Sequence, residues 1–214
     1  MPFGYIGQNL PNQTVANAGV FSISEIADLE KQGKFGGSLE LIESQTVSSV
    51  SAINFTNLKG SEFDVHLFQY KKVRFNSSAN NLSIRISDDG GSSYESSNYQ
   101  FAMFYASDVA NHNEYRNNSA SQIDIGLVGS TTSGHAMNGY FYMYNANNSS
   151  ENTLFSGQGV AFGSTAHHGQ SSHWGGGTYT QGATVNALQL KGDGGDTIVT
   201  ATVDLYGVKE LWVL

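Results

Sequence analysis

The stretch Leu82-Ser-Ile-Arg-Ile-Ser87 alternates strictly between apolar and polar side chains. Successive side chains of a β-strand point to opposite faces, so this pattern predicts a strand with one buried and one exposed face. Asp88-Asp-Gly-Gly91 follows at once, and these residue types favour tight turns. A half-buried strand that ends in a turn is typical of an antiparallel sheet.

The same alternation recurs from Gly36 to the end of the chain, where clusters of Gly, Ser and Asn separate short runs of β-forming residues. The runs are Leu39–Ile42, Val47–Phe55, Phe63–Phe75, Leu82–Ile86, Tyr99–Met103, Ile123–Leu127, Tyr140–Tyr144, Leu154–Phe162, Val185–Leu190 and Ile198–Val208. This spacing predicts an all-β fold, an antiparallel two-sheet β-sandwich over residues 36–214. About eight main strands favour a jelly-roll-like arrangement, and no fixed-period repeat supports a propeller or solenoid.

Residues 1–35 differ from the rest, because Gly and Pro interrupt any regular pattern while apolar side chains remain frequent. The apolar residues are Phe3, Tyr5, Ile6, Leu10, Val15, Val20 and Phe21. Segments that stay disordered are poor in such residues, so we expect an extended arm that packs on its own domain or on a neighbouring subunit. A short helix is predicted at about residues 22–32, since Ser22 and Glu25 form a capping box and Gly33 follows.

The composition excludes several classes of protein. Only 13% of residues are charged, and the net charge of −8 argues against nucleic acid or an anionic membrane as the partner. The chain has no cysteine, so no disulfide framework forms. No apolar run approaches the length of a membrane span, and Met1-Pro-Phe-Gly4 does not read as a signal peptide.

No cofactor or metal site is predicted. Zinc needs three or four convergent ligands, and His167, His168 and His173 lie in a Gly/Ser-rich stretch that gives no fixed geometry. We therefore expect this stretch to be a solvent-facing loop, although a ring of these histidines in an oligomer remains open. Asp193 and Asp196 flank two glycines, which indicates a turn rather than a calcium loop.

No catalytic constellation is predicted either. Ser87-Asp-Asp-Gly-Gly-Ser-Ser-Tyr94 is similar to the Asp-box of sialidase-type propellers, but a single copy indicates a tight turn in which Asp89 accepts backbone hydrogen bonds. A glycosidase needs two carboxyl groups across a cleft. Whether any two of the available acids converge stays open at this point: Asp64, Glu95, Glu114, Asp124 and Asp204.

The best candidate for a ligand or partner surface is the run Tyr140-Phe-Tyr-Met-Tyr144, together with Trp174. On a strand, Tyr140, Tyr142 and Tyr144 share one face, while Phe141 and Met143 belong to the core. A row of tyrosines offers flat apolar faces with hydroxyl rims, which suit sugar rings or a protein partner. The alternative is that the row packs under a loop or in a subunit interface.

A set of landmarks runs through nearly the whole chain in a constant order. They are Phe3-Gly-Tyr-Ile-Gly7, Gln13-Thr-Val15, Gly19-Val-Phe-Ser-Ile23, Phe35-Gly-Gly-Ser-Leu-Glu-Leu-Ile42, Phe63-Asp-Val-His-Leu67, Ile86-Ser-Asp-Asp-Gly-Gly-Ser-Ser-Tyr94, Asn138-Gly-Tyr-Phe-Tyr142, Thr184-Val-Asn-Ala-Leu188 and Val203-Asp-Leu-Tyr-Gly-Val208. With these landmarks the chain resembles a group of virion structural proteins of tailed, often marine, bacteriophages. The resemblance implies a jelly-roll-like, trimeric domain anchored through its N-terminal part. Residues 210–214 depart from the pattern as an added apolar tail.

The sequence therefore favours a non-enzymatic virion protein, made in a host cytoplasm, that contacts other capsid or tail proteins through its arm. Displaying a β-sandwich for attachment to a host-surface glycan is the leading hypothesis, as in a tail or head fibre. A capsid decoration protein that stabilises the shell is the first alternative. A glycan-active depolymerase is the second.

Overall fold

The computed structural model describes residues 24, 38–77, 80–108, 112–128, 134–162 and 170–209. The predicted arm, the C-terminal tail and the predicted helix lie outside these residues, apart from Ser24, which is helical. By internal contacts the chain divides into Met1–Ser38 and Leu39–Leu214, and all of the described strands belong to the second unit. None of the helices within the described ranges has the length and apolarity that crossing a lipid bilayer requires.

The described part of this unit forms twelve strands and one short 3-10 turn, η1 (Asp193–Gly195). The strands are β1 (Leu39–Val50), β2 (Ala52–Phe55), β3 (Val65–Phe75), β4 (Asn80–Ser87), β5 (Tyr99–Ser107), β6 (His112–Ala120), β7 (Ile123–Val128), β8 (Met137–Tyr144), β9 (Asn152–Phe162), β10 (Gln170–Gly182), β11 (Ala187–Gly192) and β12 (Ile198–Val208). The last run predicted from the sequence, Ile198–Val208, coincides with β12.

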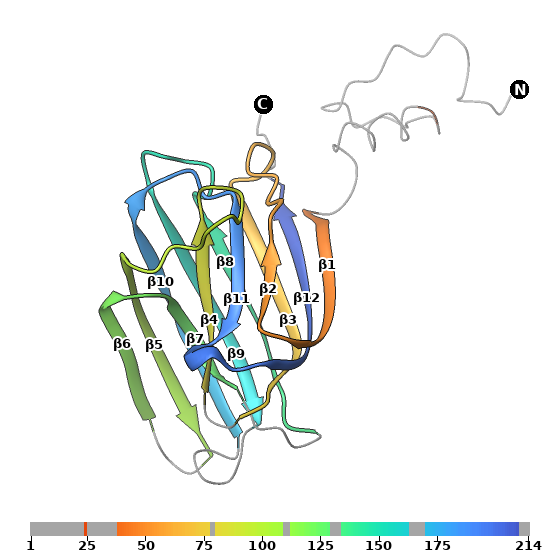
Figure 1. Ribbon diagram of the computed structural model, residues 1–214, viewed down its shortest axis with the longest axis vertical. Coiled ribbons are helices and arrows are strands. Elements are labelled where there is room, and N and C mark those ends of the chain that lie inside the picture. Colours follow the sequence, from red (N-terminus) through yellow and green to blue (C-terminus); the bar gives the residue numbers. More distant parts are fainter. Residues whose placement is uncertain are drawn as a thin grey trace, which may run out of the picture. The chain divides into compact units, whose positions relative to one another are not determined.

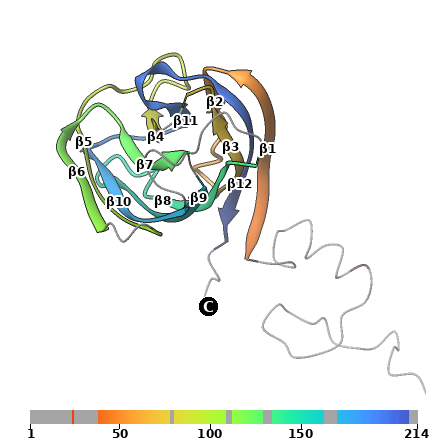
Figure 2. The same cartoon turned by 90° about the horizontal axis from the view of Figure 1, so that it is seen from below.

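The strands form two packed antiparallel sheets, which confirms the predicted sandwich (Figures 1 and 2). The large sheet has the order β1-β12-β3-β8-β9-β10-β5-β6, and the small sheet has the order β2-β11-β4-β7. The chain moves from one sheet to the other after each of β1, β2, β3 and β4, and again after β6, β7, β10 and β11. This is the jelly-roll arrangement. The meander β8–β9–β10, which lies between β3 and β5 in the large sheet, stands where a simple jelly roll has one strand.

Two strands are absent from the sequence-based prediction. The first is β6, whose residues His112–Ser119 are all exposed and therefore show no apolar alternation. The second is β10, because its run Gly175–Gly177 and its many Ser and Thr residues were interpreted as a loop. That interpretation is wrong: pairing with β9 on one side and β5 on the other holds the glycines in a strand.

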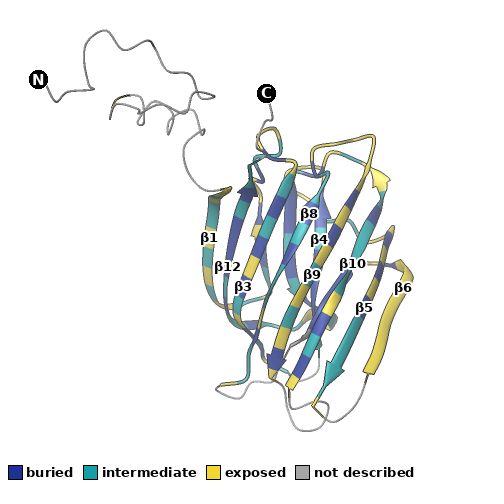
Figure 3. Cartoon of the chain, turned by 180° about the vertical axis from the view of Figure 1, so that it is seen from behind, coloured by how far each residue is buried: buried dark blue, intermediate teal, exposed yellow. Residues whose placement is uncertain are grey.

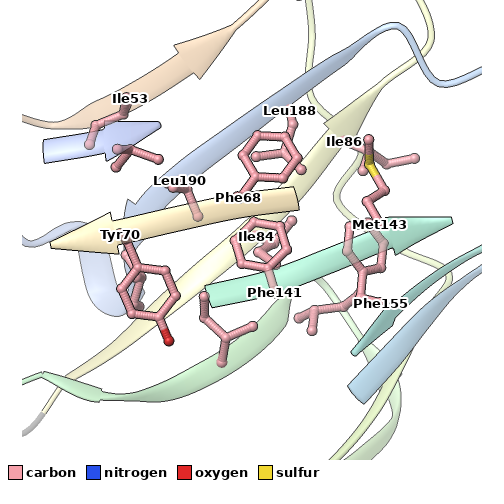
Figure 4. Packing of buried hydrophobic residues seen from close by; sticks show 14 of the residues in the cluster. Ile53, Phe68, Tyr70, Ile84, Ile86, Phe141, Met143, Phe155, Leu188 and Leu190 are labelled. Atoms are coloured by element: carbon pink, nitrogen blue, oxygen red, sulfur yellow. The ribbon is translucent and has the colours of Figure 1, made fainter. Parts of the chain in front are cut away.

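The core lies between the two sheets and is centred on β3 and β8. The ring of Phe68 stacks on Phe141 of the neighbouring strand, with centroids 4.7 Å apart and an interplanar angle of 11°. Phe55 of the small sheet meets the Phe68 ring edge-on at 5.5 Å. Figure 4 shows Phe68 and Phe141 surrounded by Ile84, Leu188 and other apolar residues. The Phe55–Phe68 contact joins the two sheets, and the Phe68–Phe141 stack joins two strands of the large sheet. Large rings of this kind bury much apolar area.

Glycines line the inner side of the large sheet beneath Tyr70. Tyr70, Gly139 and Gly159 lie directly opposite one another on β3, β8 and β9. A Cβ at Gly139 would lie 2.3 Å from the Tyr70 hydroxyl and 2.4 Å from the Gln158 carbonyl oxygen. At Gly159 it would lie 2.5 Å from the same hydroxyl. The missing side chains therefore create the space into which the phenol ring of Tyr70 extends.

The Asp-box segment forms the turn that the sequence predicts, at the point where β4 leaves the small sheet. The Ser87 Oγ donates to Asp89 Oδ1 (2.6 Å) and accepts the Gly91 amide (2.9 Å). Asp89 accepts the amide and the hydroxyl of Ser93 at 2.9 and 2.7 Å. Gly91 has a φ of +86°, which explains why glycine occupies that position. The hydrogen bonds from Ser87 and Ser93 lower the pKa of Asp89 to about 2.

We expect Gly159→Ala to lower the free energy of unfolding by about 1–3 kcal/mol, because the new methyl group overpacks the core against the Tyr70 hydroxyl. In a Tyr70→Phe background Gly159→Ala should lower the unfolding free energy by less, because the next nearest atoms to the added methyl carbon lie 3.2 Å from it. Urea unfolding of the two single variants and the double variant measures this coupling. Gly139→Ala is the matched control: the Gln158 carbonyl also blocks it, so Tyr70→Phe should not rescue it.

The turn at Asp89 predicts a pH dependence of stability. Its folded pKa of about 2 lies below the ordinary value of 3.8, so the stabilisation is complete above about pH 4 and disappears as the pH falls towards 2. The difference in unfolding free energy between wild type and Asp89→Asn should therefore narrow over that range. A difference that stays constant with pH would contradict this. Asp88→Asn is the control: it removes the neighbouring charge and should destabilise the domain less than Asp89→Asn does at neutral pH.

Candidate ligand-binding face

The outer face of the large sheet, seen from behind in Figure 3, has both exposed and part-buried strand residues. Nearly all of the exposed large apolar side chains among the described residues belong to this face. Six of the seven exposed large apolar residues among the described residues lie there: Leu39, Leu41, Leu154, Val160, Phe162 and Trp174. The seventh, Tyr115, lies on the edge strand β6 and leans over the opposite face. We call this surface the outer face. Val160 and Phe162 of β9 and Trp174 of β10 lie near one another in the strand register, and exposed apolar side chains that cluster in this way mark a site of interaction.

Tyr140 and Trp174, two of the residues predicted for the ligand surface, flank one hollow on this face. Tyr140 lies opposite Gln158 of β9, and Gln158 lies opposite Trp174 of β10. The two rings are thus two strands apart, about 10 Å, with an amide side chain between them. The hollow encloses about 310 Å³. Its lining is Asn138, Gly139, Tyr140, Gln158, Gly159, Val160, Ser172, His173 and Trp174.

Neighbouring rings support both walls of this Tyr140–Trp174 hollow. Phe104 of β5 contacts Trp174, with ring centroids 4.8 Å apart. Tyr142 meets Tyr140 edge-on at 5.9 Å and lies 6.1 Å from Tyr144. Tyr142 and Tyr144 therefore lie on the predicted face but outside the hollow, and Tyr142 packs against the ring of Tyr140.

The predicted faces of β8 are correct. Phe141 and Met143 are buried in the core, while the three tyrosines between and beside them face outward. The sequence did not indicate the polar residues of the hollow, namely Asn138, Gln158 and Ser172. One signal was available in the sequence, because Gln158 stands between Gly157 and Gly159. The inner face is too crowded for a side chain at either glycine, and a single polar residue between them faces outward.

The acid of the large sheet that faces outward on β12, Asp204, is held in an ion pair. The Lys71 ammonium lies 2.6 Å from Asp204 Oδ2, and the Ser44 hydroxyl donates to Asp204 Oδ1 at 2.5 Å. Burial acts to raise the pKa of Asp204, but the hydrogen bonds from Lys71 and Ser44 outweigh it and the pKa is lowered. Asp204 is therefore a bound carboxylate two strands away from Tyr140, not a free acid in the hollow.

The other acids considered from the sequence do not reach the hollow either. Asp124 is buried at the outer side of the small sheet, where Ser83 and Tyr115 donate to it at 2.6 and 2.9 Å. Burial raises the pKa of Asp124, although these hydrogen bonds oppose the shift. Gln122 Nε2 donates to both Asp124 (2.9 Å) and Asp193 (3.0 Å), so the amide separates these two acids. Among the described residues, no Asp or Glu lines the Tyr140–Trp174 hollow.

The predicted location of His173 is wrong. His173 lies in β10 rather than in a solvent-facing loop, and its side chain is buried beneath the hollow with its Nε2 2.9 Å from the Ser171 hydroxyl. His167 and His168 lie outside the described residues. Within the described part of the chain, no three His, Asp or Glu side chains are grouped so that they could hold a metal ion.

The arrangement suits a flat, uncharged ligand with polar edges. Aromatic rings present apolar faces to such a ligand, while the amides of Asn138 and Gln158 and the hydroxyl of Ser172 supply hydrogen-bond donors and acceptors. Pockets with mostly apolar walls and a few polar groups are typical of small-molecule sites. No protein-family model, curated protein or solved structure matches this chain.

Proposed function

We propose that this chain is a non-enzymatic structural protein of a tailed-bacteriophage virion that attaches to an uncharged glycan on the host surface. The observation that carries the attachment role is the placement of Tyr140 and Trp174 on either side of Gln158. The virion assignment rests on the resemblance of the landmark motifs from Phe3 to Val208. In this proposal the N-terminal arm anchors the protein to capsid or tail proteins, and the chain forms a homotrimer.

A sugar ring fits this site for physical reasons. Its C–H face packs on an aromatic ring, and its hydroxyl groups reach the amides and hydroxyls around the rim. A carboxylate or phosphate ligand gains nothing here, because no basic side chain lines the hollow among the described residues. Single sugars bind weakly to so open a site, and many copies on one particle convert weak binding into avidity.

A role in capsid decoration is the second candidate, and one observation favours it. Leu39 and Leu41 are 45% and 54% exposed on the edge strand β1, far along the sheet from the hollow. Apolar side chains at a sheet edge favour contact with another protein. Copy number in purified particles, measured by quantitative mass spectrometry against the major capsid protein, separates the candidates. A few to a few tens of copies supports attachment, a ratio near one per capsomer supports decoration, and absence from particles contradicts both.

We expect Trp174→Ala and Tyr140→Ala each to weaken glycan binding about tenfold or more, because each removes one aromatic wall of the site. The measurement is isothermal titration of the purified chain with uncharged polysaccharides such as dextran, galactomannan and glucomannan. Leu154→Ala is the matched control, since Leu154 is equally exposed on the same face but lies outside the hollow. Failure of wild type to bind any glycan of the host surface would overturn the proposal.

A further inference from the structure

We infer that the Tyr140–Trp174 hollow is one end of a longer groove that binds a linear, uncharged oligosaccharide across several strands. This inference rests on the proposed glycan binding and specifies its ligand class. Two further hollows lie on β10, β5 and β6, beside the first. These strands are neighbours in the large sheet, on the side towards β6 (Figure 3).

The larger of the two, which we call the middle hollow, has a volume of about 670 Å³. Its lining is Gln100, Phe101, Ala102, Arg116, Asn117, Asn118, Gly176 and Gly177. Gly176 lies opposite Ala102, and Ala102 lies opposite Arg116, so small residues form its floor. Trp174 and Phe104 are each two residues away on the same face, and their contacting rings stand between this hollow and the first.

The third, which we call the end hollow, has a volume of about 320 Å³ and shares Gln100 and Asn118 with the middle hollow. It is lined almost entirely by hydroxyl and amide groups, including those of Ser97, Asn98, Ser119, Ser121 and Thr180. The first hollow and the middle hollow therefore follow one another from β8 to the edge strand β6, and the end hollow continues along β5 and β6 to the start of β5 and the end of β6. Four strand spacings separate β8 from β6, about 19 Å, which exceeds the length of one sugar ring.

The lining of the groove selects an uncharged chain. Hydroxyls and amides dominate the end hollow, and the middle hollow combines three amide side chains with the apolar surface of Phe101, Ala102 and two glycines. The amides and hydroxyls match the donors and acceptors of sugar hydroxyls, and the apolar surface suits the C–H face of a sugar ring. Arg116 is the only ionised side chain of the groove among the described residues, and Glu114 lies 4.0 Å from it. The pair cancels the local charge, and the net charge of −8 disfavours an acidic polysaccharide. The small floor at Gly176 and Ala102 lets a chain continue past the Trp174 ring.

The test compares oligosaccharides of increasing length. We expect the affinity of wild type for cello-, malto- or manno-oligosaccharides, whichever binds, to rise about tenfold or more from disaccharide to hexasaccharide. Ala102→Tyr places a ring in the middle hollow at an exposed strand position that accepts it. This variant should bind short oligosaccharides with the affinity of wild type, but its affinity should not rise as the oligosaccharide becomes longer. Titration calorimetry gives the affinities, and thermal unfolding checks the fold.

Leu154→Tyr is the matched control, because it adds a similar ring to the outer face outside all three hollows and should leave the length dependence unchanged. Equal affinity of wild type for short and long chains, abolished by Trp174→Ala, would overturn the extended groove and leave the proposed function standing. Full length dependence in Ala102→Tyr would also overturn it. No binding of any oligosaccharide by wild type would overturn the groove together with the proposed function.

Discussion

The domain depends on the packing of large aromatic rings against a glycine-lined stretch of the large sheet. Tyr70 extends over Gly139 and Gly159, and Phe141 lies against Gly157. A small sheet of four strands faces a large sheet of eight. Side chains of the large sheet itself must therefore help to fill the interior beneath the meander β8–β9–β10. Rings from β3 and β8 fill it only because these glycines carry no side chain. Dense packing of this kind leaves little tolerance for an added methyl group.

The same constraint shapes the outer face. Strand side chains alternate between faces, so the glycines of the inner face fix Tyr140, Gln158 and Trp174 on the outer one. Because the inner side is filled by tightly packed rings, the backbone beneath the hollow is firmly supported. Sites built on supported strands hold their side chains in place better than sites built on loops. The core and the proposed binding site are therefore two sides of one packing arrangement.

Much of this fold could be predicted from the sequence, but the assembly of the site could not. Period-two alternation identified β4, β8 and β12, and turn chemistry identified the role of Asp89. Local patterns failed for β10, where glycines in a strand look like a loop until the pairing with β9 and β5 is known. The register of β8, β9 and β10 brings Gln158 between Tyr140 and Trp174. Such long-range pairing leaves no trace in a single strand.

The position of Trp174 has an optical consequence. It is one of only two tryptophans in the chain, and it is 44% exposed at a wall of the hollow, in contact with Phe104. Indole fluorescence shifts to shorter wavelength when water is excluded from the ring. The hollow thus contains an intrinsic fluorophore, and a ligand that packs on the Trp174 ring alters the emission of the unlabelled protein.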